Sequence, residues 1–271
     1  MNGRDSRRPL WFDSRNKPAT RGSVSNVRAL LPSLLLAAAA PLAGAPAHFA
    51  SGPAPVALIE LFTSEGCSSC PPADAWMGAM RERPGLWSEF VPVQFHVDYW
   101  DGLGWKDRLA SREYTSRQYA YASAWGARSV YTPCFVRNGR EWKPKWGSGG
   151  VGGAPAGSLA LDGADGAAWV ATFAPAAGTG AAGYAVHVAL LGFGISSRVS
   201  AGENGGATLR HDFVVLSLRS RPLARSPDGT LRASVELARD AGVPCARHAI
   251  AAWVTPQGSL LPVQATGGWL P

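Results

Sequence analysis

The stretch "TSEGCSSCPPAD", from Thr63 to Asp74, decides how this sequence of 271 residues is interpreted. Cys67 and Cys70 are separated by two residues, after an apolar run and before a segment with the composition of a helix. Such a pair is a redox-active dithiol, half of a metal site, or a disulfide that only stabilises its loop. The residues on either side help to choose among these three.

The pattern around the two cysteines predicts alternating strands and helices. The strands are expected from apolar or alternating runs, and the first helix tolerates prolines in its first turn. Asn138-Gly139 is the strongest short hairpin signal in the chain. The expected elements are a strand over 55–63, a helix over 71–85, a strand over 89–100, a helix over 109–125 and a hairpin over 128–143.

The amino-acid composition divides the rest of the chain into a Gly- and Ala-rich segment and a segment of β-prone runs. Residues 147–182 are dominated by Gly and Ala, which predicts an interdomain linker with one short helix around 167–173. Beyond it, β-prone runs alternate with Gly, Pro or Asp and predict a small antiparallel sandwich or open sheet. The expected domains are a signal peptide over 1–50, a first domain over 51–146, the linker, and a β-rich domain over 183–271.

The net charge gives little reason to expect a nucleic-acid partner. The formal charge is +7, but residues 1–50 hold seven basic and two acidic residues, so 7 − 2 = +5 of it lies there. The remaining +2 is spread over the rest of the chain, whereas phosphate binding needs a concentrated basic face.

The first fifty residues predict a secretory signal peptide with a long basic lead-in. The apolar segment "ALLPSLLLAAAAPLAGAPAHFA" ends in small residues, with Ala45-Pro46-Ala47 as the expected cleavage site. Prolines interrupt it, and its apolar core is shorter than the ~20 residues that a membrane span requires. We therefore expect a periplasmic or secreted protein that meets a membrane only through an uncleaved signal segment.

Two sites in the sequence carry the chemistry. At a helix N-terminus the pKa of Cys67 should fall, which makes its thiolate the nucleophile, and only this first sulfur should be easily attacked from outside. Cys70, one turn further on, can resolve a mixed disulfide. Thr132-Pro133 follows roughly sixty residues later. A cis proline beside a dithiol exposes backbone groups that can hold an extended peptide, and X-Pro is the only common bond that adopts cis.

These motifs resemble a known family. The order of elements resembles the thioredoxin fold, and "ELFTSEGCSSCPPADAW", "FHVDYWDGLGWKDR", "SVYTPCFVRNG" and "AGENGGATLRHDFVV" are similar to the DUF1223 family of secreted thioredoxin-like proteins. The resemblance implies an α/β fold, with a thioredoxin-like domain followed by a small β-rich, sandwich-like domain. It also implies that Cys67 and Cys70 take the nucleophile and resolving positions and that Pro133 takes the cis-proline position.

Two further residues are compared with thioredoxin and with the family. Thioredoxins carry a buried acid on the strand before the dithiol, and Glu60 is the nearest counterpart, one residue further from Cys67, so a proton relay through Glu60 is a hypothesis. Cys134 follows Thr-Pro, where family members tend to have Gln. It is either a third thiol near the site or, as is usual for a lone cysteine in an apolar strand, a small core residue.

Several polar residues are accessory candidates. His96 and Asp98 share one face of the second predicted strand, for metal binding or proton transfer, or as a hydrogen-bonded pair that orders the next loop. Asn204 lies in a Gly-rich stretch, where turn formation or interdomain contact explains it as well as a ligand does. His211 is expected to be a surface or sheet residue.

Together these features predict an exported thiol-disulfide oxidoreductase that acts on protein thiols or disulfides, with no cofactor and no bound metal. One alternative is a copper-handling protein that uses reduced Cys67 and Cys70 with His96, because soft thiolates and an imidazole suit Cu(I). Another is a non-catalytic binding module in which the disulfide is only structural. A zinc site is not expected, because no second cysteine or histidine pair lies at ligand spacing.

Overall fold

The structure is a computed structural model, and most of the chain after the predicted leader is described. Of the described residues, 44% lie in strands and 14% in helices. The fold is therefore mostly β-sheet with few helices and mixed sheets, and its helix content is lower than the expected α/β class implies; in the described residues of 183–271 the regular elements are strands, as expected there. The described residues are 45–144, 153–164, 168–178, 183–237 and 242–271.

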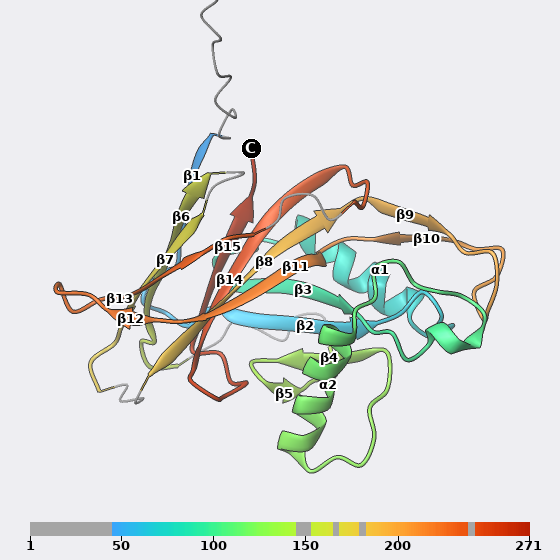
Figure 1. The fold of residues 1–271 in the computed structure, drawn as a ribbon, viewed down its shortest axis with the longest axis horizontal. Helices are drawn as coiled ribbons and strands as arrows, with labels where there is room; N and C mark the ends of the chain where they lie inside the picture. The colour runs from blue at the N-terminus through green and yellow to red at the C-terminus, as the bar shows by residue number, and fades with distance from the viewer. Residues whose placement is uncertain (1–44, 145–152, 165–167, 179–182, 238–241) are drawn as a thin grey trace, which may run out of the picture. The chain divides into compact units, whose positions relative to one another are not determined.

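The largest sheet combines strands from both halves of the chain (Figure 1). Its strands are, in spatial order, β15 (Gln264–Trp269), β14 (Arg247–Pro256), β8 (Tyr184–Phe193), β11 (Val214–Pro222), β3 (Phe90–His96), β2 (Ala57–Thr63), β4 (Cys134–Arg137) and β5 (Arg140–Glu141). β3 is parallel to β2 on one side and to β11 on the other, and all other neighbours are antiparallel. The predicted division into two domains stays a prediction, but its two halves share this sheet.

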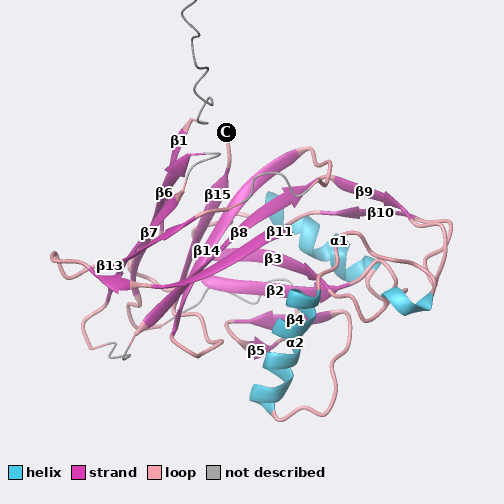
Figure 2. Ribbon diagram, viewed as in Figure 1, coloured by secondary structure: helices cyan, strands magenta, loops and turns pink. Residues whose placement is uncertain are grey.

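Two smaller sheets complete the strands that the structure describes (Figure 2). The first has the order β1 (Pro46–Ala50), β6 (Gly157–Ala164), β7 (Trp169–Pro175), β13 (Leu231–Val235) and β12 (Ala224–Arg225), and the second pairs β10 (Thr208–His211) with β9 (Ile195–Arg198). The short helix predicted around 167–173 is wrong, because Trp169, Ala171 and Phe173 alternate inward along β7. β1 lies within the segment predicted as the signal peptide, and residues 1–44 of that segment lie outside the described residues.

The helices cover opposite faces of β2 and β3. They are α1 (Pro71–Ala79), η1 (Met80–Glu82), η2 (Asp101–Leu103) and α2 (Arg112–Trp125). Thr63, at the end of β2, bonds Asp74 of α1, whereas Phe62 packs its ring against Tyr121 of α2. Because successive side chains of a strand point to opposite faces, these two contacts place α1 and α2 on opposite sides. The predicted first strand, both helices, second strand and hairpin are confirmed.

Two large apolar cores and a small one around Leu109, Ile195 and Val214 hold these layers together in the described part of the chain. One surrounds β2 and β3 and includes Phe62, Phe95 and Met77, all fully buried. The other lies between the five-stranded sheet and β8 and β14, with Phe173 and Val188 inside it.

Among the described residues, no helix is long and apolar enough to cross a membrane. The cysteine loop follows the end of β2, whose residues are all buried.

Candidate functional site

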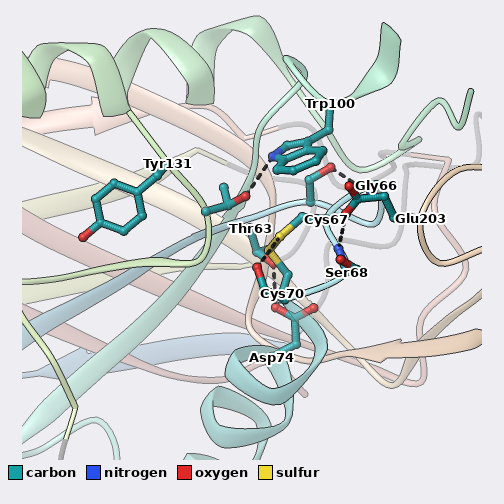
Figure 3. Close-up of a disulfide and its surroundings, with 12 residues drawn as sticks. Thr63, Gly66, Cys67, Ser68, Cys70, Asp74, Trp100, Tyr131 and Glu203 are labelled. Carbon is teal, nitrogen blue, oxygen red and sulfur yellow. Dashed lines mark hydrogen bonds between the residues drawn. A yellow bond between two sulfur atoms is a disulfide. The ribbon is translucent and has the colours of Figure 1, made fainter. Parts of the chain in front are cut away.

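The two cysteines of the opening motif form a disulfide between β2 and α1 (Figure 3). Their Cα atoms are 5.4 Å apart, and the Cys70 N–H donates to the Cys67 carbonyl at 3.1 Å, which forms the turn. Cys70 is the N-cap of α1, and Pro71 follows at a position where a missing N–H costs nothing. Both cysteines are 0% exposed, so the expectation that Cys67 is easily attacked from outside is wrong for this conformation.

A loop from the second half of the chain covers the cysteine turn. We call residues 199–207 the cover loop. Its Asn204 side-chain amide donates to the carbonyls of Glu65 at 2.8 Å and Cys67 at 3.0 Å. The Ser68 N–H donates to the carboxylate of Glu203 at 3.0 Å, a contact that lowers the pKa of Glu203 (Figure 3). Asn204, for which an interdomain contact was one expectation, therefore joins the two halves of the chain.

Thr132-Pro133 lies at the same end of β2 as the disulfide, and its peptide bond is cis, as predicted. β4 pairs antiparallel with β2 so that Cys134 is opposite Phe62, which brings Pro133 to the end of β2 where the cysteine loop begins. The Trp100 indole N–H donates to the Thr132 hydroxyl at 2.8 Å (Figure 3). Trp100 thus connects the Thr-Pro segment with the loop that follows β3.

Cys134 has the properties of a core residue. Its side chain is 2% exposed, and burial raises the pKa of its thiol to about 11. At neutral pH the thiol is therefore protonated and a poor nucleophile.

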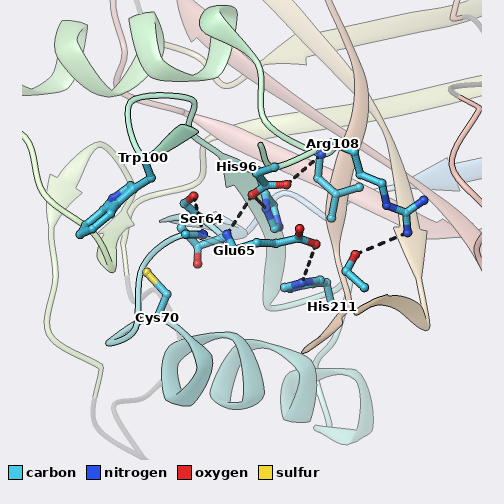
Figure 4. A network of polar contacts seen from close by, with 12 residues as sticks. Ser64, Glu65, Cys70, His96, Trp100, Arg108 and His211 are labelled. Carbon is cyan, nitrogen blue, oxygen red and sulfur yellow. Dashed lines mark hydrogen bonds and ion pairs between the residues drawn. The ribbon is translucent and has the colours of Figure 1, made fainter. Parts of the chain in front are cut away.

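A network of buried charges lies behind the disulfide (Figure 4). His211 of β10 is 1% exposed, with Nε2 3.4 Å from Glu65 Oε1 and Nδ1 3.3 Å from Asp74 Oδ2. Burial acts to lower the pKa of His211, but the carboxylates of Asp74 and Glu65 outweigh it and raise the pKa to about 9. His211 is therefore a buried imidazolium at neutral pH; it is a sheet residue, one of the two alternatives expected, and not a surface residue.

His96 and Asp107 form the other half of this network. His96 Nδ1 lies 2.7 Å from Asp107 Oδ2, and both side chains are fully buried. Burial acts to raise the pKa of Asp107, but His96 and the N–H groups of Glu65 and Leu109 lower it to about 2. Asp107 also accepts the Glu65 N–H at 2.9 Å, so it joins the loop after β3 to the cysteine loop.

The structure separates Asp98 from His96. Asp98 Oδ1 accepts the Thr115 hydroxyl at 2.6 Å on α2, while His96 points to the α1 side, where its Nε2 lies 3.3 Å from the side-chain nitrogen of Gln94. The two residues expected to share a face therefore serve different contacts, and Asp107 takes the place beside His96.

Glu60 lies on the face of β2 opposite to Asp74. It forms an ion pair with Arg117 of α2 at 2.6 Å and accepts a hydrogen bond from the Tyr121 hydroxyl. Arg117 is surrounded by the rings of Phe95, Tyr121 and Trp253, and the Glu60 carboxylate raises its pKa against the effect of burial. These contacts explain Glu60 as part of a buried ion pair, on the other side of the sheet from the network behind the disulfide.

The network contains residues that the sequence did not single out. No pattern distinguishes Glu65 from the rest of its loop or Asp74 from the rest of its helical segment. Asp107 belongs to the polar and aromatic loop after the second predicted strand, which suits either ligand binding or packing over the site. The signal that was available is the position of Asp74, one turn after Cys70 on a helix that begins at the dithiol. Among the described residues, no group of three or more His, Cys, Asp or Glu is placed to hold a metal ion.

These features define a mostly β protein with a buried disulfide at the junction of its two halves. The chain belongs to the DUF1223 family, because the model of that family, described as a protein of unknown function, matches residues 58–255. None of the curated proteins matches the chain.

Two solved structures are similar in fold. One is a crystal structure of a structural-genomics target protein from Agrobacterium tumefaciens, with 24% identity and a TM-score of 0.51, over 80% of this chain and 94% of that one. The other is HBP35 of Porphyromonas gingivalis, with 16% identity and a TM-score of 0.55, over 81% of this chain and 76% of that one. At these identities the similarity concerns the fold alone.

Proposed function

We propose that this chain is an exported, thioredoxin-like thiol-disulfide oxidoreductase that acts on protein thiols or disulfides. The observation that carries the proposal is the Cys67–Cys70 disulfide at the first turn of α1, beside the Thr132-Pro133 segment. A dithiol at a helix N-terminus is stabilised as a thiolate, which is the reactive form. The thioredoxin-like topology and the export are parts of the same proposal.

In the proposed reaction the thiolate of reduced Cys67 attacks a partner disulfide. One partner sulfur leaves as a thiolate, and the other stays bound to Cys67 as a mixed disulfide. Cys70 then loses its proton and attacks Cys67, which releases the second partner thiolate and forms the Cys67–Cys70 bond. Two electrons pass to the partner. Because both cysteines are buried, the cover loop has to move away before a partner sulfur reaches Cys67.

The test is exchange between the reduced protein and glutathione disulfide, followed by mass spectrometry. Cys67→Ser should abolish the exchange, Cys70→Ser should accumulate a glutathione adduct on Cys67, and Cys245→Ser serves as the control for a thiol outside the site. Exchange by Cys67→Ser at the rate of the wild type would refute the proposal.

A structural disulfide in a non-catalytic binding module is a second candidate, favoured by the burial of both cysteines. The reduction potential of the pair distinguishes the two candidates. A value between about −120 and −270 mV is that of catalytic exchangers, and one below about −300 mV is that of a structural disulfide. The copper-handling alternative stays a prediction, to be tested by Cu(I) titration of the reduced protein with and without His96.

A further inference from the structure

The buried charges behind the disulfide are unusual for a site that needs only two cysteines. The five side chains of this network are at most 4% exposed. Burying an ion costs several kcal/mol even when it is paired, and apolar residues of similar size are often at least as stable. A buried charge network beside a reactive group is therefore a candidate for function. Its members are Glu65, Asp74, His96, Asp107 and His211.

His211 stands at the centre of this network. It faces Glu65 from the cysteine loop, Asp74 from α1 and the ring of His96 from β3, whose centroid is 4.8 Å away. Within the described part of the chain, neither nitrogen of His211 has a partner with hydrogen-bond geometry, and Glu65 Oε1 also lacks one. The charge of the two carboxylates therefore holds the proton on His211, and Asp74 Oδ2, at 3.3 Å from Nδ1, is the nearer of the two to a ring nitrogen.

Asp74 lies between His211 and the cysteine turn. It is one helical turn after Cys70, and its N–H donates to the Cys70 carbonyl at 3.1 Å. Its carboxylate accepts the hydroxyl of Thr63 at 2.8 Å on one oxygen and faces His211 with the other. Figure 3 shows Asp74 directly beside Cys70 and Thr63, at the first turn of the helix.

The same two residues also reach a pocket. A pocket of about 720 Å³ lies between α1 and β10, and both Asp74 and His211 line it. Arg210 and the Arg81–Asp212 ion pair, 2.8 Å between the charged atoms, line it as well. Neither cysteine is among the lining residues, so Asp74 and His211 stand between the disulfide and this second opening.

We infer that Asp74 and His211 deliver the proton that Cys70 takes up when the disulfide is reduced, and that the pocket beside α1 resupplies it. The inference rests on the proposed function. His211 acts through Asp74 and is thus a positioning residue for this proton. A buried thiolate without a partner is costly, so proton delivery to Cys70 favours its departure.

In the proposed step a dithiol reduces the Cys67–Cys70 disulfide. A reductant thiol loses its proton to solvent and attacks Cys67; the Cys67–Cys70 bond breaks, and Cys70 leaves with the electron pair. His211 gives its proton to the Asp74 carboxylate, Asp74 passes a proton to the Cys70 thiolate, and His211 regains one from solvent through the pocket. The second reductant thiol loses its proton and attacks the first reductant sulfur, so that Cys67 leaves as a thiolate. Two electrons have moved from the reductant to the cysteines.

The test is the pH profile of disulfide reduction by dithiothreitol, measured by stopped-flow tryptophan fluorescence in the full chain. Each rate is divided by the concentration of dithiothreitol thiolate, which removes the ionisation of the reagent. The corrected rate of the wild type should fall as the pH rises through about 9, the pKa of His211. His211→Gln and Asp74→Asn should be about tenfold slower or more at neutral pH and should lose this pH dependence.

His187→Gln is the control, because His187 is a half-buried histidine of β8 that bonds Ser220 and Thr255, outside the network. It should keep the wild-type profile. Wild-type profiles in folded His211→Gln and Asp74→Asn would overturn the inference. Should both variants fail to fold, a corrected wild-type rate that stays constant from pH 6 to about 10 overturns it by itself. Because dithiothreitol needs no protein partner, this result is independent of whether Cys67 exchanges with glutathione disulfide.

Discussion

Replacing Glu60 by Gln distinguishes a structural ion pair from a proton relay. Glu60 is 0% exposed, and its carboxylate neutralises Arg117, whose side chain is only 10% exposed. In Glu60→Gln, the guanidinium keeps its charge among three aromatic rings and retains the hydroxyl of Tyr121 at 3.2 Å. The remaining partners do not neutralise it.

The expected loss follows from these contacts. Removing one partner of a buried ion pair costs about 3 to 5 kcal/mol. Cation–π contacts and the amide oxygen of the new Gln side chain retain part of the stabilisation, so we expect the lower end, about 3 kcal/mol. The measurement is urea unfolding at pH 7, followed by circular dichroism. The double variant Glu60→Leu with Arg117→Met is the control and should recover most of the loss, because it leaves no unpaired charge.

The same variant tests the proton-relay hypothesis. Because Glu60 faces α2, whereas Asp74 belongs to α1 on the other side of the sheet, Glu60→Gln should leave the rate of disulfide reduction and its pH profile unchanged. If Glu60→Gln lowered the free energy of unfolding by less than about 1 kcal/mol, the result would contradict a buried ion pair, because exposed ion pairs contribute that much or less. A changed pH profile of reduction would restore Glu60 as a relay.

Three further predictions concern His211, Asn204 and Cys134. Because its folded pKa is raised from 6.5 to about 9, His211 stabilises the fold fully below pH 6.5 and loses this contribution, about 3 kcal/mol, as the pH rises through 9. Urea unfolding at a series of pH values should show the decline in the wild type but not in His211→Gln. Asn204→Ala removes two hydrogen bonds of the cover loop and should accelerate reduction by dithiothreitol about tenfold; an unchanged rate would show that the loop does not limit access. Cys134→Ala should leave exchange with glutathione disulfide unchanged, and a decrease would contradict its assignment to the core.

The local part of the site could be predicted from the sequence, because its signals lie within a few residues of each other. Cys67 and Cys70 follow a strand and precede a helix, and the Thr132-Pro133 bond is cis before the next strand. The side of the sheet on which Glu60 lies could also be predicted. Glu60 and Thr63 are three residues apart on one strand, so their side chains point to opposite faces, and only one of those faces carries α1.

The remaining part of the site depends on long-range pairing that no local pattern contains. His211 and Asn204 come close to the cysteine loop because β11 pairs with β3, through Val214 and Gln94, more than a hundred residues apart in the chain. A strand pattern predicts that such a segment exists, but it does not predict the neighbour that the segment pairs with. The mostly β character was underestimated for a related reason, since the Gly- and Ala-rich composition of β6 and β7 resembles a linker.

The pairing of β11 with β3 gives the second half of the chain two roles at the disulfide. The cover loop, which precedes β10, contacts the cysteine turn through Glu203 and Asn204, and β10 itself carries His211 to the charge network behind it. The cover loop and β10 form one continuous segment. The access of a partner to Cys67 and the charge of His211 behind Cys70 therefore both depend on that segment. A partner that displaced this segment would uncover the disulfide. It would at the same time move His211 and so change the electrostatic field around Cys70. Opening the site and changing the reactivity of the disulfide would therefore be one event.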